Sequence, residues 1–298
     1  MKLTSQALDA LRVGFKATYQ AAFDAEAGRE DYLKIAEIVT STAGEEKYGW
    51  LGELPGMREW IGARVVHGLA EHDYAIKNKD FELTVAVDRN HIEDDTLGTY
   101  GTRFKTLGRA AARNPNQLVF GALKAGFSTN CYDGQSFFDT DHPVIGEDGK
   151  MTTVANTDGG TGAPWFLLAT REIIKPILFQ NRKDPQFVSK DAPTDDNVFS
   201  KKQFVYGVDA RRNVGYGMWQ MAWGSKQTLD AEHYKAARGA IGGMKGDHGS
   251  PLGINPNLLV VPRSLEGAAL ELLNAERNAA GATNVWKGTA ELFVCDWL

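Results

Sequence analysis

The sequence predicts a soluble α+β protein, and three observations carry that prediction. Helical and alternating apolar patterns both occur along the 298 residues, but without the regular strand–helix–strand rhythm of a parallel α/β fold. Apolar residues make up 43% of the chain and charged residues 24%, which is ordinary for a globular protein and excludes wholesale disorder. The 32 glycines exceed an average composition, which predicts many turns and close backbone approaches.

Charge and apolar runs restrict the partners and the compartment. The 33 Lys+Arg against 38 Asp+Glu give a net charge of −5, which leaves no footprint for tight nucleic-acid binding. The longest uncharged run, Gly249–Pro262, is shorter than the roughly 18 residues that cross a membrane. Asp9 and Arg12 interrupt the N-terminus, so it has no signal-peptide core. With only Cys131 and Cys295, we expect a cytoplasmic protein without disulfides or a membrane partner.

The first part of the chain predicts a helix followed by an irregular segment. Apolar residues recur every three or four positions over residues 4–27, which predicts an amphipathic helix that stops at Gly28. The sequence does not decide whether this helix docks on its own domain or on a neighbouring subunit. Residues 40–60 alternate glycine, proline and aromatic residues with charges, which predicts an irregular segment, and residues 58–66 are then expected to form a short helix.

A strand and a long helix follow. Residues 81–89 alternate apolar and polar side chains, which predicts a half-buried strand. The strongest helical stripe then runs from residue 93 to 126 and predicts a spine helix about 45 Å long at 1.5 Å per residue. The acidic run 93–95 is expected at the start of that helix, where it favours capping over acid–base chemistry. Pro115 should kink the helix or divide it in two.

The remaining elements are shorter and separated by turns. Residues from 130 to about 200 are rich in turn sequences, and Pro176 inside the strand-like run 171–180 predicts an edge strand or a bulge. The further expected elements are a strand at 203–208, a helix at 230–244, a buried strand at 257–261, a helix from Leu265 to Leu273 and a final strand within 284–298.

One cluster of side chains invites a chemical interpretation. Cys131, Asp133, Asp139, Asp141 and His142 are residue types that bind metals, but their spacing fits neither a zinc pattern nor a calcium loop. A Cys131–His142 nucleophile pair has no recognisable local signature, and a small buried thiol is the commoner outcome. The glycine pairs at 159–162 and 215–217 do not continue into a nucleotide-binding motif. We therefore predict no catalytic, cofactor or metal site, and keep a thiol- or metal-dependent hydrolase using Cys131 and His142 as the alternative.

Aromatic and arginine side chains in the irregular segment suggest a contact surface instead. These residue types are enriched in buried protein interfaces. Most tryptophans elsewhere, such as Trp165 and Trp219, are expected to be ordinary core residues. The candidate subunit-interface residues are Tyr48, Trp50, Leu51, Arg58, Glu59, Trp60 and Arg64.

Several long strings together resemble the major head (capsid) subunit of Mu-like tailed phages and prophages. The similarity runs in one order from about residue 1 to 298, and strings of this length are more specific than short motifs. The strings are YGWLGELPGMREWIGARVV (48–66), YAIKNKDFELTVAVDRNHIEDDTLG (74–98), CYDGQSFFDTDHP (131–143), ATREIIKPILFQNRKDPQF (169–187), VFSKKQFVYGVDARRNVGYGMWQMA (198–222) and HGSPLGINPNLLVVPRSLEGAALELL (248–273).

The resemblance implies the major capsid fold of tailed phages and herpesviruses, the Hong Kong 97 type. It also implies a division of the chain into the parts that this fold contains. These parts would be an N-terminal arm (1–45), an extended loop with its flanking strand (46–92), a peripheral domain with the spine helix (93–129), an axial domain (130–264) and a return to the peripheral or central sheet (265–298).

The function implied by the resemblance is self-assembly rather than catalysis. Such subunits form hexamers and pentamers of an icosahedral virion shell that encloses double-stranded DNA without sequence-specific binding. A scaffold protein, a maturation protease, a portal protein and a decoration protein are the implied partners, with assembly in the host cytoplasm. We expect no covalent crosslinks between subunits, since no lysine–asparagine pair stands out. The other structural alternative is a tail or baseplate component.

Overall fold

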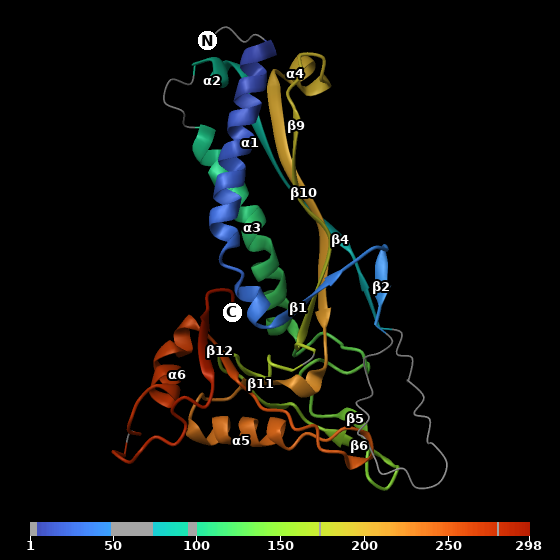
Figure 1. The fold of residues 1–298 in the computed structure, drawn as a ribbon, viewed down its shortest axis with the longest axis vertical. Helices are drawn as coiled ribbons and strands as arrows, with labels where there is room; N and C mark the ends of the chain where they lie inside the picture. Colours follow the sequence, from blue (N-terminus) through green and yellow to red (C-terminus); the bar gives the residue numbers. More distant parts are fainter. Residues whose placement is uncertain (1–4, 49–73, 95–99, 173, 279) are drawn as a thin grey trace.

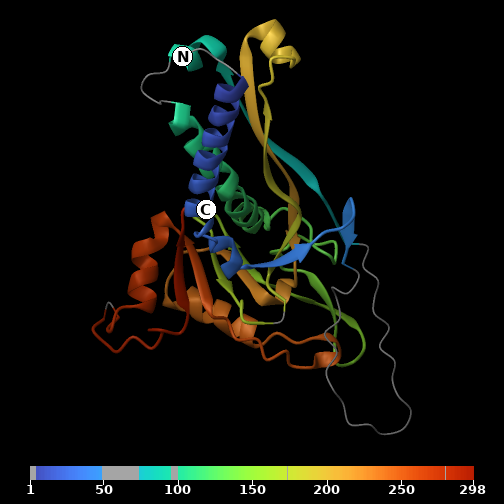
Figure 2. The same ribbon diagram turned by 45° about the horizontal axis from the view of Figure 1, so that its top comes forward.

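The computed structural model describes residues 5–48, 74–94 and 100–298, apart from residues 173 and 279. The molecule is elongated, and two sheets follow one another along its long axis (Figure 1). A four-stranded sheet carries two long helices on one face, and a five-stranded sheet at the other end is accompanied by two shorter helices (Figure 2).

The chain passes back and forth between the two sheets, so elements of each sheet are interleaved along the sequence. The helices are α1 (Ser5–Ala27), α2 (Arg89–Asp94), α3 (Tyr100–Ala125), α4 (Asp196–Lys201), α5 (Ala231–Gly242) and α6 (Glu266–Leu273). The four-stranded sheet has the order β1 (Ala36–Thr40), β9 (Ile177–Lys190), β10 (Gln203–Tyr216), β4 (Lys79–Asp88). The five-stranded sheet has the order β13 (Glu291–Cys295), β12 (Leu258–Pro262), β8 (Trp165–Leu168), β11 (Ala222–Lys226), β7 (Thr157–Gly160). Two small ribbons pair β2 (Glu45–Lys47) with β3 (Ala75–Lys77) and β5 (His142–Ile145) with β6 (Met151–Val154).

The first core lies between the two long helices and the four-stranded sheet. Phe15 of α1 stacks on Phe104 of α3 with ring centroids 4.1 Å apart, and Tyr206 of β10 meets both rings edge-on. Gly108 lets the backbones approach, since a Cβ there would lie 2.4 Å from the carbonyl oxygen of Tyr19. The predicted helix 4–27 is therefore confirmed, and it docks on its own chain.

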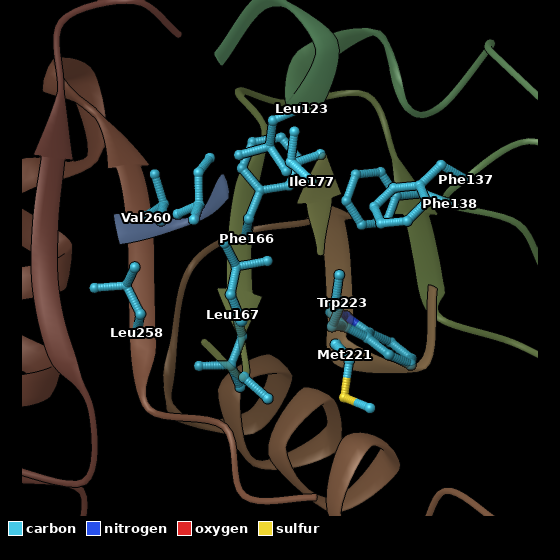
Figure 3. Packing of buried hydrophobic residues seen from close by; sticks show 14 of the residues in the cluster. Leu123, Phe137, Phe138, Phe166, Leu167, Ile177, Met221, Trp223, Leu258 and Val260 are labelled. Carbon is cyan, nitrogen blue, oxygen red and sulfur yellow. The ribbon is translucent and has the colours of Figure 1, made fainter. Parts of the chain in front are cut away.

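The second core surrounds the five-stranded sheet and the C-terminal half of α3. Every residue of β8 and β12 is buried, because these strands lie inside the sheet with helices or loops over their faces. Figure 3 shows Leu123 of α3 above Phe166 and Leu167 of β8, with Leu258 and Val260 of β12 alongside. The predicted strand 257–261 is confirmed, as are the helices 230–244 and 265–273 within a few residues.

The long helix differs from its prediction at its start, and of the two outcomes expected at Pro115, a kink or a division, the division does not occur. The helix begins at Tyr100, whereas Glu93 and Asp94 are the last residues of the separate helix α2, and Asp95 lies outside the described residues. The helix has 26 residues and continues through Pro115, so the proline does not divide it. The next side chain, Asn116, joins this part of the helix to the segment after α1: its Oδ1 accepts a hydrogen bond from the Tyr32 amide, and its Nδ2 donates to the carbonyl of Arg29.

Three strand predictions were incomplete. Residues 130–200 include the buried strand β8 and not only turns. Pro176 lies directly before β9, which is an inner strand between β1 and β10, so the predicted edge position is wrong; its carbonyl accepts the Gly217 amide. The final strand is limited to β13, while the predicted strand 81–89 is confirmed as β4. Within the described residues, no helix combines the length and apolar character needed to span a membrane.

Replacing Gly108 with alanine is expected to lower the free energy of unfolding by about 1–3 kcal/mol, because the added methyl group pushes α1 away from α3. Gly121→Ala in the same helix is the matched control, since nothing lies within 4 Å of its Cβ position. It is expected to gain up to about 1 kcal/mol from helix propensity. Urea unfolding of the unassembled full-length chain measures both values, and equal changes would contradict a close α1–α3 contact.

Candidate functional site

The ribbon β2–β3 is the point at which residues 49–73 leave and rejoin the described chain. Its strands pair antiparallel, with Glu45 opposite Lys77 and Lys47 opposite Ala75. Figure 1 places β2 beside the lower half of the four-stranded sheet. Gln180 of β9, which is 0% exposed, is one of the residues that join this ribbon to the sheet.

A closed set of buried hydrogen bonds surrounds Gln180. Tyr48 Oη donates to its Oε1 at 2.8 Å. The Gln180 Nε2 group donates to the Ile76 carbonyl at 2.9 Å and to Asn78 Oδ1 at 2.8 Å. Asn78 Nδ2 then donates to Ser41 Oγ at 2.8 Å. Because every polar group of the Gln180 amide has a partner, the ribbon is held in a single orientation on the sheet.

We call the ribbon β2–β3 and the residues that bind it to the sheet the loop base. Tyrosine and glycine residues complete it. Tyr74 Oη accepts the Tyr216 amide at 2.8 Å, and a Cβ at Gly215 would lie 2.2 Å from Ile76 Cδ1, so only glycine permits this approach. Burial raises the pKa of Tyr48 and of Tyr74 to about 12. Both hydroxyls are therefore neutral at physiological pH, and the Tyr48 hydroxyl can donate its proton to Gln180.

The predicted interface residues fall into two groups. Tyr48 is 3% exposed and packs within its own chain, where it serves the loop base. The other six candidates lie outside the described residues: Trp50, Leu51, Arg58, Glu59, Trp60 and Arg64. Sequence reasoning missed Gln180 and Asn78, because a buried amide carries no periodic or spacing signal.

The second candidate site is the cluster that the sequence analysis singled out. Cys131, Asp133 and His142 bring their ligand-type atoms within 4.8 Å of one another, whereas Asp139 and Asp141 do not join them. His142 Nδ1 lies 2.7 Å from Asp133 Oδ2, and the Cys131 thiol donates to Asp133 Oδ1 at 3.1 Å. Cys131 and His142 therefore share the carboxylate of Asp133.

The other side of the His142 ring is also occupied. Asn156 Nδ2 donates to the carbonyls of Phe137 and Trp219, which turns Asn156 Oδ1 toward His142 Nε2 at 3.2 Å. Both ring nitrogens thus face oxygen atoms of the same chain. The ring stacks on Trp219 with centroids 4.0 Å apart. His142 therefore ties the β5 strand to the second core.

The electrostatics of this cluster favour a structural role. Burial acts to raise the pKa of Asp133, but hydrogen bonds from His142 and Cys131 outweigh it and hold that pKa below its ordinary value. Burial, and then the Asp133 carboxylate, raise the pKa of the Cys131 thiol far above its ordinary value. The thiol is therefore un-ionised, it donates to the Asp133 carboxylate and not to the His142 imidazole, and it is only 5% exposed. This geometry does not support the hydrolase alternative.

The same contacts bear on metal binding. Cysteine, aspartate and histidine are suitable ligand types for a transition metal. Here, however, the carboxylate oxygens and both imidazole nitrogens already take part in hydrogen bonds within the chain. A metal held by the three side chains would break the Cys131–Asp133 and Asp133–His142 contacts, so the cluster as it stands fits a buried hydrogen-bonded network better than a metal centre.

Comparison with known proteins gives consistent similarities over the whole chain. The family model described as Mu-like prophage major head subunit gpT matches residues 8–298. The chain is 38% identical to the major capsid protein of Escherichia phage Mu over 100% of both sequences. It is 44% identical to the Mu-like prophage FluMu major head subunit of Haemophilus influenzae, over 93% of this chain and 92% of the relative.

Solved structures give the same result. The chain in the procapsid of bacteriophage JBD30 superposes with a TM-score of 0.84 at 42% identity, covering 99% of this chain and 100% of that one. In the JBD30 capsid decorated with minor capsid protein trimers, the TM-score is 0.79 at 34% identity, with 91% of each chain covered.

Gln180→Leu is expected to destabilise the unassembled chain by about 2–4 kcal/mol, because it leaves Tyr48 Oη, Asn78 Oδ1 and the Ile76 carbonyl without this partner. Amide hydrogen exchange should rise in β2 and β3. Gln186→Leu, at an exposed position of the same strand, is the matched control and is expected to change neither quantity. Unchanged exchange in β2 and β3 of the Gln180 variant would contradict the role of this network.

Asp133→Asn is expected to lower the free energy of unfolding by about 2 kcal/mol at neutral pH, because His142 loses its charged acceptor. A carboxyl with a depressed pKa contributes stability above its ordinary pKa and loses it as the pH falls through the lowered value. The difference between wild type and variant should therefore shrink below about pH 4. Urea unfolding at stepped pH measures this, with exposed Asp141→Asn as the control. A difference that persists at low pH would contradict the assignment.

Proposed function

Since the chain belongs to the family of Mu-like prophage major head subunits, it is a major capsid protein with a Hong Kong 97-type fold, and we propose that its hexamers and pentamers close an icosahedral shell around double-stranded DNA. The family, the α+β capsid fold, the virion location and the non-enzymatic role predicted from the sequence are thereby confirmed. Self-assembly into a shell follows from the capsid structures that the chain resembles.

The hydrogen-bonded loop base supports a specific part of this proposal. A shell repeats one set of contacts many times, so a segment that contacts a neighbour must leave its own subunit at a constant angle. The network around Gln180 fixes β2 and β3 on the sheet and meets this requirement. We therefore assign residues 46–92 to the extended loop and its flanking strand, with the candidates between residues 50 and 64 contacting the adjacent subunit.

The remaining domain boundaries are part of the same proposal. Residues 1–45 supply the arm, 93–129 the spine, 130–264 most of the axial domain and 265–298 the return. The long strands β9 and β10 fall within 130–264 but run along α3 in the four-stranded sheet. We accordingly group residues 177–216 with the spine helix rather than with the five-stranded sheet.

The proposed partners follow from the capsid role. A scaffold protein and a maturation protease would act during assembly in the host cytoplasm, and a portal protein would occupy one vertex. The JBD30 capsid is decorated with minor capsid protein trimers, and we propose a comparable decoration protein for this shell. The net charge of −5 suits a container that encloses DNA without binding it specifically.

Trp60→Ala is expected to abolish shell formation while leaving the unassembled chain folded, because truncating a tryptophan in a protein interface often removes a large share of the binding energy. Wild type and variant would be co-expressed with the neighbouring phage genes and examined by negative-stain microscopy, with circular dichroism to verify folding. Wild type should give closed shells. Rings or tubes from the wild type would favour the tail or baseplate alternative, and normal shells from Trp60→Ala would contradict the interface assignment.

A further inference from the structure

The four-stranded sheet and α3 enclose a cleft below the first core. Its volume is about 200 Å³, and small residues create it, since Ala110 and Ala111 of α3 lie opposite Ala210 of β10 and Pro185 of β9. Leu83 of β4 is one of the lining residues and is 41% exposed.

A buried charged side chain, Arg212, lies in the wall of this cleft. Arg212 of β10 is 3% exposed, and its Nε and Nη2 atoms have no hydrogen-bond partner in the described part of the chain. Its guanidinium lies 5.8 Å from the Phe179 ring centroid, which is a weak contact for a buried cation. Asn114 Oδ1, in the same wall, is likewise unpartnered. A guanidinium stays protonated in proteins, so the charge must be met by an anion.

The acidic groups nearby accept no hydrogen bond from the Arg212 Nε or Nη2 atoms. Asp184 attracts Arg212 electrostatically, but its Oδ1 accepts a hydrogen bond from Asn181 Nδ2 at 2.7 Å. Glu82 at the rim accepts the Thr84 hydroxyl through Oε2 at 2.5 Å. Burial lowers the pKa of Arg212, which is consistent with a cation that lacks a partner in the single chain.

We propose that this cleft receives a carboxylate side chain from an adjacent copy of the chain in the shell. The planar guanidinium suits a singly charged carboxylate, whereas a phosphate would bring a second charge against apolar walls. β4, which contributes Phe81, Glu82 and Leu83 to the lining, is an edge strand whose outer side has no strand partner in the described sheet, so another chain can approach there. With 38 acidic residues per subunit, a second copy is a ready source of the anion. The proposal rests on the capsid function.

The substitution Arg212→Met is expected to have different effects on the unassembled subunit and on the assembled shell. In unassembled subunits it is expected to leave the thermal midpoint unchanged or to raise it, because it removes an unpaired buried charge. In assembled shells it is expected to lower the midpoint by about 4 °C, because the neighbour's carboxylate loses its partner. Arg211→Met is the matched control, since Arg211 is more exposed and already lies 3.5 Å from Asp80. A shift of the same sign in subunits and shells would overturn the proposal.

Two further measurements identify the source of the carboxylate. Millimolar sodium benzoate should raise the midpoint of unassembled wild-type subunits but not of Arg212→Met, and should leave wild-type shells unchanged because their cleft is filled. A benzoate-dependent rise in the shells would overturn the neighbour as occupant. Glu82→Gln is expected to leave both midpoints unchanged, and a loss equal to that of Arg212→Met would assign the carboxylate to the chain itself.

Discussion

Helix α3 is the element on which the rest of the structure depends, because it contributes to both hydrophobic cores. Phe104 and Leu107 pack under α1 and the four-stranded sheet, while Phe120 and Leu123 pack against the five-stranded sheet. One rigid helix thus links the two sheets, and a change in its packing at either end would alter the angle between them. A capsid subunit needs that angle to be reproducible, because every contact in the shell repeats it.

Buried polar groups differ in whether they find their partners within the single chain. The amide of Gln180 and the ring of His142 have partners on all sides, so both act as internal joints. Arg212 lies equally deep but has no ion pair in the described residues. The contrast explains why the first two stabilise a single chain, while the third gains its partner only in an assembly.

The Cys131–Asp133–His142 cluster shows why residue types alone are weak evidence for catalysis. The three side chains do meet, as their spacing in a short segment allows. Their hydrogen bonds, however, direct the thiol to a carboxylate and place His142 between two acceptors. The same residues that suggest a nucleophile and base in the sequence are a buried structural network in the fold.

The sequence by itself determined the elements whose signal is local. Apolar periodicity located α1, β4 and β12, and long strings shared with Mu-like head subunits identified the family and its fold. Only the tertiary structure decided which strands are inner, that Pro115 is tolerated and that Gln180 meets Tyr48 across 132 residues of sequence. The physical reason is that periodicity reports one element's own burial, whereas pairing and polar contacts depend on which distant elements share a core.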